Sequence, residues 1–300
     1  MSGVADTVSR ASSDVSVIIP YFNREQYIDE AIQSVLAQTL KPLEIVIVND
    51  GSQESSRRHL DRYADVCTIV DMAASGGAAQ ARNAGVRKAH GQFIAFLDDD
   101  DVWLPEKLEV QRRYFDEHTE CDLVHSSVWA FFATRPDELR TCDWGPQLTL
   151  AQALTHNHWV FLQTIMIRTE VFRTLGGFDA RFRGSEDHDL VIRCCAAGYR
   201  IEGIRQPLVR YRQEGHASLT RKYWRMYLTA AQLVWKHRKL YKRTYGIRGM
   251  VSFLLATLSI AVNRSDLYPK PSYLSRCVSK GVRLLLRTIS VKYQVKTEPQ

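Results

Sequence analysis

The sequence predicts an α/β fold with a mainly parallel central sheet flanked by helices. Short runs rich in β-branched residues alternate with segments of about a dozen residues that have helical periodicity, an alternation typical of βαβ units. Polar residues follow each run at the point where a strand would end. Open α/β sheets bind ligands at the carboxyl ends of their strands, so the front half of the chain is predicted to be a nucleotide-binding unit.

Four strands and four helices are predicted in this front half. The strands are VSVIIP at residues 15–20, LEIVIV at 43–48, a weaker run within 65–71, and FIAFL at 93–97. The helices cover residues 24–38, 53–64, 77–90 and 105–118. The last of them has Pro105 at its first position, where the N–H that proline lacks has no partner within the helix.

The fourth strand is followed directly by four acids. They are Asp98, Asp99, Asp100 and Asp101. Neighbouring carboxylates repel one another and are costly to remove from water, and a shared cation relieves both effects. Hard divalent ions such as Mg2+ and Mn2+ bind carboxylate oxygens and leave positions open for substrate phosphates. The alternative is a solvated acidic turn before the helix near Pro105, but ligand chemistry favours the metal site.

The loops after the other strands also carry polar groups, each with a plain structural interpretation. NDGS at residues 49–52 is equally typical of a turn and helix N-cap, and the small residues around Gly76 and Gly77 are compatible with a closely packed helix start. Arg82 is compatible with a solvated helix charge. The sequence lacks a Gly-Lys-Ser/Thr phosphate loop, and no Gly-x-Gly-x-x-Gly follows the first strand, which disfavours P-loop NTPases and dinucleotide dehydrogenases.

Six short motifs together resemble glycosyltransferase family 2. They are VSVIIPYFN, VNDGS, SGGAAQARNAG, FLDDDDVW, GGFD at residues 176–179 and EDHDL at 186–190. Each motif is weak alone, but their order and spacing over residues 15–220 are specific. The resemblance implies the GT-A fold, in which a mainly parallel sheet is flanked by helices. It also implies a nucleotide-sugar donor and an inverting transfer to an acceptor.

The resemblance assigns donor-binding roles to residues in the front half. Pro20, Phe22 and Asp50 correspond to positions that hold the nucleotide base, and Asp50 would accept the imide hydrogen of a uracil-type base. Arg82 would approach the diphosphate, which suits a planar guanidinium. Asn49 stands where the family often has a further Asp, a mild departure because Asp50 occupies the base-binding position.

The resemblance assigns the acid run to the ribose and the metal. Asp98 would lie near the ribose, and Asp100 would ligate a divalent ion, Mn2+ or Mg2+, that bridges the diphosphate. Asp99 is an additional acid at a position that is often small and polar. His216, in a segment that resembles the end of the family's catalytic domain, is a candidate for the metal or the diphosphate, although a solvent-facing loop histidine is favoured by its context. Trp103 is compatible with either sugar stacking or the core.

Asp187 is the candidate general base. Composition alone explains the segment, because Ser185 followed by acids suits the start of a helix and its dipole. In the family, however, the Asp at this position removes the proton of the acceptor hydroxyl, which then attacks the anomeric carbon opposite the nucleotide. Glu186 and Asp189 are expected to raise the pKa of Asp187 by like-charge repulsion.

The charge of the chain divides sharply near residue 220. Residues 221–300 hold 17 Lys and Arg but two acids, a net charge of +15, whereas residues 1–220 hold 23 basic and 31 acidic residues, a net charge of −8. Residues 272–292 place Lys280, Arg283 and Arg287 on one helical face and mainly apolar residues on another. This pattern favours an amphipathic helix on an anionic membrane over helices that pack on the catalytic domain with solvated basic faces. No nucleic-acid-binding signature accompanies the charge.

The sequence therefore predicts three regions. Residues 1–13 are expected to be disordered, residues 14–220 to form the catalytic domain, and residues 221–300 to form a basic helical region. The six cysteines form no Cys-x-x-Cys pair, and the N-terminus has no apolar signal core, so a reducing cytoplasm and a peripheral position at the inner face of the membrane are expected.

The predicted function is transfer of a sugar, from a UDP-sugar foremost, to a hydroxyl of a lipid-linked or cell-surface glycan. Two alternatives remain from other classes. A nucleotidyltransferase on a related fold would also use paired aspartates, and a membrane-docking relative would keep the fold without turnover. The retention of Asp100 and Asp187 argues against the second alternative.

Overall fold

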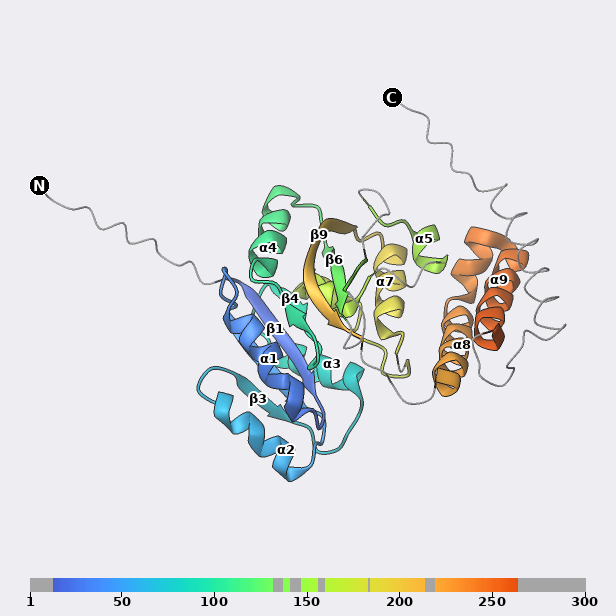
Figure 1. Ribbon diagram of the computed structural model, residues 1–300. Helices are drawn as coiled ribbons and strands as arrows, with labels where there is room; N and C mark the ends of the chain where they lie inside the picture. The colour runs from blue at the N-terminus through green and yellow to red at the C-terminus, as the bar shows by residue number, and fades with distance from the viewer. Residues whose placement is uncertain are drawn as a thin grey trace, which may run out of the picture.

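A computed structural model describes residues 13–131, 137–140, 147–155, 160–182, 184–213 and 219–263. The described part is built around one mixed sheet with strand order β3-β2-β1-β4-β8-β6-β9-β5, and β7 pairs with β6 (Figure 1). The strands are β1 (Val15–Tyr21), β2 (Glu44–Asn49), β3 (Thr68–Asp71), β4 (Phe93–Phe96), β5 (Val102–Trp103), β6 (Leu123–Phe131), β7 (Glu138–Arg140), β8 (Met166–Arg168) and β9 (Ile201–Arg212).

The first four strands are parallel, as the sequence predicts. A helix precedes each of β2, β3 and β4, and the carboxyl ends of β1, β2 and β4 meet at one edge of the parallel part of the sheet. Beyond β4 the sheet becomes mixed: β8 runs antiparallel to β4 and β6, β9 runs parallel to β6, and β5 closes the order antiparallel to β9. The predicted fold class is confirmed.

Helices cover both faces of the sheet. The α-helices are α1 (Glu25–Leu36), α2 (Glu54–His59), α3 (Ala78–Lys88), α4 (Lys107–Glu117), α5 (Leu150–Thr155), α6 (Thr169–Thr174), α7 (Glu186–Ala197), α8 (Leu219–Lys236) and α9 (Arg238–Asn263), with short 3-10 turns η1 (Leu60–Tyr63) and η2 (Leu162–Thr164). The helix predicted at residues 53–64 is therefore divided between α2 and η1.

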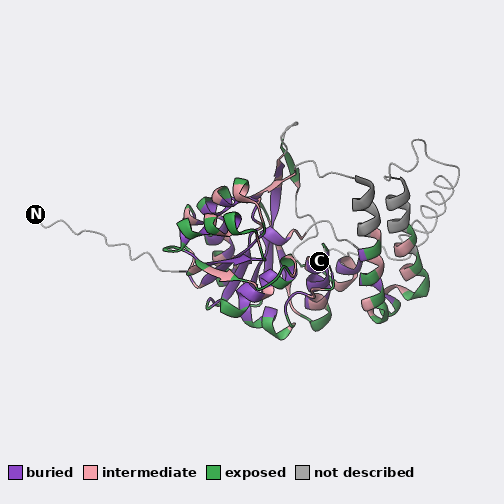
Figure 2. Ribbon diagram, turned by 90° about the horizontal axis from the view of Figure 1, so that it is seen from below, coloured by how far each residue is buried: buried purple, intermediate pink, exposed green. Residues whose placement is uncertain are grey.

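The alternation of side chains along β1 explains the layers. Val17 and Ile19 point into the apolar cluster beneath α1 and α4, whereas Ile18 points into the cluster beneath α3, α6 and α7. All three side chains are fully buried, and Figure 2 shows the burial along the sheet and the exposed outer faces of the helices. Because β1 is covered on both faces, it reads as a continuous apolar run rather than an alternating one.

The helices α8 and α9 form a pair beside α5 and α7 at the right of Figure 1. Leu233, Val234 and Tyr241 are buried in the same apolar cluster as α7, so the pair shares the core of the catalytic unit although α8 begins at the predicted boundary. Gly246 interrupts α9 with φ 69°. In the part of the chain that the structure describes, no helix has the length and hydropathy needed to span a bilayer.

Two sequence predictions concern regions outside the described residues. The expected disorder of the N-terminal segment falls almost entirely there, and so does the amphipathic helix at 272–292. Four of the six cysteines lie in the described residues. Cys67, Cys121, Cys194 and Cys195 are free thiols, and the adjacent pair in α7 forms no disulfide.

Candidate active site

The loops after β1 and β2 are joined by hydrogen bonds at the edge of the sheet. The Asn23 N–H donates to Ser52 Oγ at 3.2 Å, and the Gln53 N–H donates to Asn23 Oδ1 at 2.8 Å. Asn23 holds a left-handed conformation with φ 50°, which its short polar side chain tolerates. Pro20 lies in β1, and the ring of Phe22 is 47% exposed. An exposed aromatic ring at this edge is available to stack on a base.

Asp50, directly after β2, organises the loop before α3. Its carboxylate accepts hydrogen bonds from the N–H groups of Gly76 (2.7 Å) and Gly77 (2.9 Å) and from Ser75 Oγ (2.9 Å). Gly51 allows the loop after β2 to lie close to the loop before α3, because its φ is +73° and a Cβ there would lie 2.8 Å from the Ser75 nitrogen. A carboxylate offers about four acceptor positions, so Asp50 keeps one for a further donor.

Arg82 joins three distant segments. It is 4% exposed in α3, and its guanidinium donates to Asp98 after β4 and to Glu186 Oε1 at the start of α7 at 2.8 Å. The Arg82 Nε is buried without a hydrogen-bond partner in the described structure. The arginine predicted for the diphosphate is thus held by two carboxylates, 16 and 104 residues away along the chain.

Arg24 is a site residue that the sequence analysis missed. One nitrogen, Nη1, lies 2.9 Å from Asp99 Oδ1 and 2.7 Å from Asp100 Oδ2. Asp99 also accepts the Phe22 N–H at 3.4 Å, which ties the acid run to the loop after β1. The signal in the sequence is a basic residue immediately after that loop, but a lone arginine at a helix start has many other uses.

The fourth acid, Asp101, faces the end of β9 rather than the edge where Arg24 lies. Its Oδ1 accepts the Arg212 N–H at 2.8 Å, and the Arg212 Nε donates to the Asp100 carbonyl at 2.8 Å. Asp101 is 1% exposed, and its Oδ2 has no hydrogen-bond partner in the described structure. Asp101 therefore fixes the carboxyl end of the acid run against β9.

Burial opposes the ionisation of Asp99, Asp100 and Asp101. Burial raises the pKa of Asp99 to about 7, with the Arg24 charge opposing the shift. Burial raises the pKa of Asp100 as well, and beyond burial the charge of Asp98 adds to the shift. Burial and the same neighbour raise the pKa of Asp101 far above its ordinary value. These carboxylates are short of positive charge, because ionising them in low dielectric is unfavourable without a cation.

The donor set fits a divalent ion that is completed by a substrate. Six carboxylates gather here against three guanidinium groups: Asp98, Asp99, Asp100, Asp101, Glu186 and Asp187 against Arg24, Arg82 and Arg212. Among the described residues no group of three or more metal-ligating side chains is preformed. Mg2+ and similar ions are commonly bound by one or two carboxylates plus substrate phosphates. Asp100 at this edge can provide such a carboxylate. His216 lies outside the described residues.

Asp187 is placed beside the Arg82 network at the start of α7. Its Oδ1 accepts the N–H of the adjacent His188 at 2.7 Å. Burial raises the pKa of Asp187 to about 7, and the charge of Glu186 adds to the shift. A carboxylate that titrates near neutral pH is suited to accept a proton from an acceptor hydroxyl. The predicted effect of Glu186 is present.

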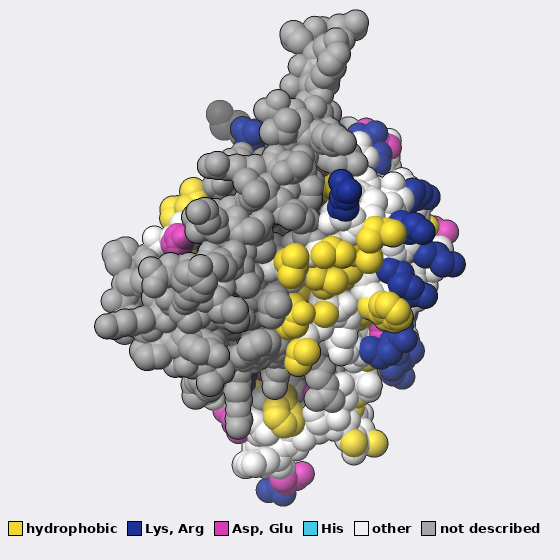
Figure 3. All heavy atoms as spheres, turned by 90° about the vertical axis from the view of Figure 1, so that its right-hand side faces the viewer, with side chains coloured by type: hydrophobic (Ala, Val, Ile, Leu, Met, Phe, Trp, Pro, Cys, Tyr) yellow, Lys and Arg dark blue, Asp and Glu magenta, His cyan; other side chains and the backbone are white. Residues whose placement is uncertain are grey.

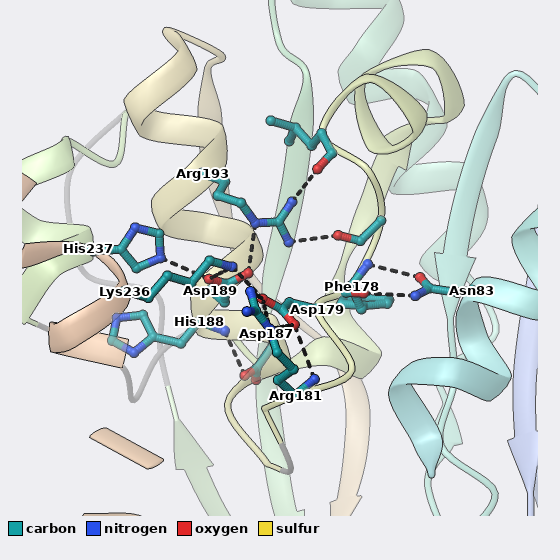
Figure 4. Close-up of polar contacts among 12 residues, drawn as sticks. Asn83, Phe178, Asp179, Arg181, Asp187, His188, Asp189, Arg193, Lys236 and His237 are labelled. Atoms are coloured by element: carbon teal, nitrogen blue, oxygen red, sulfur yellow. Dashed lines mark hydrogen bonds and ion pairs between the residues drawn. The ribbon is translucent and has the colours of Figure 1, made fainter. Parts of the chain in front are cut away.

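Asp189, the other acid expected to raise the pKa of Asp187, is paired with positive groups of a different network. Burial alone would raise its pKa, but hydrogen bonds from His237 and Lys236 and the charge of Arg193 outweigh burial and lower the pKa to about 2. Lys236 Nζ lies 2.6 Å from Asp189 Oδ1, and the Arg193 Nε lies 2.7 Å from Asp189 Oδ2 (Figure 4).

The same network connects the GGFD turn and α8. Lys236 Nζ is also 2.8 Å from Asp179 Oδ2, and Arg193 donates to the carbonyls of Leu175 and Gly177 at 2.7 Å each. We name Asp179, Asp189, Arg193, Lys236 and His237 the α7–α8 clasp. The clasp holds the helix that carries Asp187 against the C-terminal helix pair, as Figure 4 shows. No local sequence pattern predicts this pairing, because its members are up to 58 residues apart.

Trp103 is a core residue. Its ring is 2% exposed, its Nε1 donates to the Gln163 carbonyl at 3.0 Å, and the Lys107 ammonium lies 4.0 Å from its ring centre. Of the two interpretations left open by the sequence, sugar stacking is therefore wrong and core packing is confirmed.

Comparison with solved structures supports the fold. The first 349 residues of TarS from S. aureus, crystallised with UDP-GlcNAc, superpose with a TM-score of 0.59 at 18% identity, covering 93% of this chain and 91% of that one. A mannosyltransferase from Pyrobaculum calidifontis, in complex with GDP-Man and Mn2+, gives a TM-score of 0.60 at 18% identity, covering 96% and 88%. The fold shared with these proteins is the GT-A fold.

Proteins similar to this chain in sequence are named as glycosyltransferases. An uncharacterised glycosyltransferase of Rickettsia prowazekii is 29% identical over 185 residues, which is 59% of this chain and 57% of the relative. One from Nostoc is 35% identical over 215 residues, 67% of this chain and 65% of the relative. The aligned region is thus less than two thirds of the length of these relatives. The family model described as Glycosyl transferase family 2 matches residues 16–176, more than half of the chain. The chain belongs to glycosyl transferase family 2.

Proposed function

We propose that the protein transfers a sugar from a nucleotide-diphosphate sugar to the hydroxyl of a glycan acceptor, with inversion at the anomeric carbon. The observation that carries the proposal is the junction of the acid run with α7. There, buried Arg82 binds Asp98 and Glu186, and Asp187, with a pKa of about 7, lies next in the chain. Arg82 thereby links Asp98, which we assign to the donor, to the start of α7, where we assign Asp187 to the acceptor.

The donor would lie along the carboxyl edge of the parallel strands. The exposed ring of Phe22 and the neighbouring Pro20 support one face of a base, and the remaining acceptor position of Asp50 suits the imide N–H of uracil. TarS has been crystallised with UDP-GlcNAc and the Pyrobaculum enzyme with GDP-Man, so the family's fold accommodates both bases. We propose a UDP-sugar because a carboxylate pairs with the imide of uracil.

We propose that Asp100, with the donor diphosphate, holds Mn2+ or Mg2+, and that His216 is an additional candidate ligand. When bound, such an ion neutralises charge that grows on the departing diphosphate. We propose that Asp98 contacts the ribose and that Asp99 lies at the same face of the donor. Arg82 has two nitrogens already on carboxylates and presents its guanidinium to a diphosphate only if one of those pairs loosens.

Asp187 would act as the general base. Its ionised carboxylate takes the proton of the acceptor hydroxyl while the acceptor oxygen forms a bond to the anomeric carbon. The bond from that carbon to the diphosphate oxygen breaks, and its electron pair leaves with the nucleoside diphosphate. Attack from the face opposite the nucleotide inverts the configuration. The base is regenerated when the proton passes to solvent.

We propose a lipid-linked or cell-surface glycan as the acceptor, with the enzyme bound peripherally at the inner face of the cell membrane. The support is the +15 charge of residues 221–300 and the amphipathic pattern that contains Lys280, Arg283 and Arg287. The position of these three residues lies outside the described structure.

A direct assay separates this proposal from its alternatives. Purified protein is incubated with UDP- and GDP-sugars, with Mn2+ or with a chelator, and release of nucleoside diphosphate is measured. The proposal expects metal-dependent release of a nucleoside diphosphate from at least one donor. A nucleotidyltransferase would instead release pyrophosphate from a nucleoside triphosphate, and a relative without turnover would release neither product although it binds nucleotide.

A further inference from the structure

The C-terminal helix pair exposes large apolar side chains on its outer surface. Leu228 and Trp235 are two turns apart on α8 and are 58% and 71% exposed. Ile247, Val251 and Leu255 follow at four-residue spacing on α9 and are 58%, 42% and 38% exposed. Spacings of seven and four residues place such side chains on one side of each helix. Contiguous exposed apolar surface of this kind marks an interaction site more often than chance.

Basic side chains border this apolar surface. Residues 219–263 contain nine Lys and Arg but lack Asp and Glu. The exposed basic residues of α9 are Arg238, Lys239, Lys242, Arg243 and Arg248. Figure 3 shows dark blue side chains gathered beside the yellow apolar ones on this side of the molecule. We name the five apolar residues and these five basic residues the α8–α9 face.

The α8–α9 face points away from the catalytic unit. The opposite side of α8 is occupied, because Leu233 and Val234 are buried in the core and Lys236 and His237 pair with α7 through the clasp. Because its neighbours Val234 and Lys236 face the catalytic unit, Trp235 lies on the outer side of α8. The face lies on the side of α8 opposite the contacts with α7, the helix that carries Asp187.

We propose that the α8–α9 face docks on an anionic lipid bilayer, with Trp235 and Leu228 inserted at the level of the headgroups. Aliphatic and indole groups beside Lys and Arg, with acids absent, are the pattern that an interfacial helix needs. A nucleic acid would match the charge but not the exposed Leu, Ile and Val. The inference rests on the proposed glycosyl transfer to a membrane-linked acceptor, and it assigns the membrane contact to α8 and α9 rather than to Lys280, Arg283 and Arg287 alone.

Two other occupants fit less well. Residues 264–300 of the same chain carry eight Lys and Arg and two acids, so they would bring positive charge against a basic face. A second copy of the chain, paired symmetrically through this face, would place the same basic residues against one another. An anionic bilayer matches both the charge and the apolar groups.

The test is co-sedimentation of the full chain with vesicles. Vesicles of phosphatidylcholine are compared with vesicles that contain about 30% phosphatidylglycerol, at low and high salt. Leu228→Ser with Trp235→Ser is expected to weaken partition into the anionic vesicles by about tenfold or more, because two large apolar groups no longer insert. The matched control is Leu43→Ser with Val66→Ser, two side chains of the catalytic unit that are 45% and 53% exposed, and it should leave partition unchanged.

Three results would overturn the inference: equal binding by the α8–α9 variant and the wild type, equal binding of the wild type to neutral and anionic vesicles, or a variant that only converts a dimer to a monomer in sedimentation velocity. Misfolding is excluded by comparing the thermal transitions of the variants and the wild type, which should be the same. A single variant, Ile247→Ser, provides a milder change of the same face. The proposed function is measured separately, because release of nucleoside diphosphate in vesicle-free buffer should be the same in these variants and the wild type. Absence of that release from the wild-type protein would refute the proposed function and leave the vesicle result intact.

Discussion

Replacing Lys236 with Met tests whether the α7–α8 clasp stabilises the catalytic unit. The ammonium lies 2.6 Å from Asp189 and 2.8 Å from Asp179, and Asp189 is fully buried. Methionine keeps most of the stem that runs toward Phe182, whose ring centre is 5.1 Å from the Lys236 Nζ. The substitution therefore removes charge and hydrogen bonds while it preserves much of the packing.

The magnitude follows from the pKa of Asp189. Its partners hold the pKa at about 2, against an ordinary value of 3.8, although burial pushes it upward. That difference corresponds to about 2 kcal/mol of net stabilisation of the ionised form. Lys236 shares this with Arg193 and His237, and its own side chain is 25% exposed, so we expect Lys236→Met to lower the free energy of unfolding by about 1–2 kcal/mol.

Urea denaturation provides the measurement, with Lys239→Met, an exposed lysine outside the clasp, as the matched control. The control should change the free energy of unfolding by less than about 0.5 kcal/mol. Because the folded-state pKa of Asp189 is depressed, its contribution is present above about pH 4 and is lost as the pH falls through about 2. The gap between the Lys236 variant and the wild type should therefore close over that window. A variant as stable as the control at pH 7 would show that Lys236 does not stabilise the ionised Asp189.

Three further substitutions test the site and the tail. Asp100→Ala should abolish transfer and weaken donor binding measured by calorimetry with Mn2+, and near wild-type transfer in the presence of a chelator would contradict the metal assignment. Arg24→Gln removes the cation that contacts Asp99 and Asp100, so donor-free protein should bind Mn2+ about tenfold more tightly by electron paramagnetic resonance; equal or weaker binding would place Arg24 in a purely structural role. Charge reversal of Lys280, Arg283 and Arg287 to Glu should reduce binding to anionic vesicles in a salt-dependent manner while donor hydrolysis in solution survives, and unchanged partition would leave these residues as solvated surface.

Truncation near residue 220 is a poor substitute for that charge reversal. It would remove Leu233, Val234 and Tyr241 from the shared core and leave the buried Asp189 without Lys236 and His237. A buried carboxylate deprived of such partners destabilises the fold strongly. Loss of activity in a truncated protein would therefore report on stability as well as on membrane contact.

The sequence predicted the part of the site that depends on local pattern. Asp50 and the acid run follow short apolar runs, and parallel strands bring such positions to one edge whatever the details of packing. The alternation of strand and helix is enough to establish that topology for β1 to β4. The mixed half of the sheet was less accessible, because β8 has three residues and β5 has two.

The parts that were missed depend on contacts between distant segments. Arg82 and Glu186 are 104 residues apart, and Asp189 meets His237 across 48 residues. No periodicity links such pairs, since burial and the path of the chain decide which charges meet. Trp103 shows the same limit: an aromatic residue beside an acid run suits a sugar or the core equally, and its burial and its hydrogen bond to the Gln163 carbonyl distinguish the two.

The proposed role of Asp187 as the general base of an inverting transfer is best measured through the pH-dependent kinetics of Asp187→Asn. With a donor identified from the nucleotide-sugar panel, the wild-type kcat/KM for transfer should rise with pH through about 7, as the Asp187 carboxyl ionises. The variant should lose roughly two to four orders of magnitude in kcat and lose that rise, while its donor affinity stays near the wild-type value. A variant that keeps turnover at saturating donor but binds the donor poorly would contradict the account and place Asp187 in the nucleotide pocket.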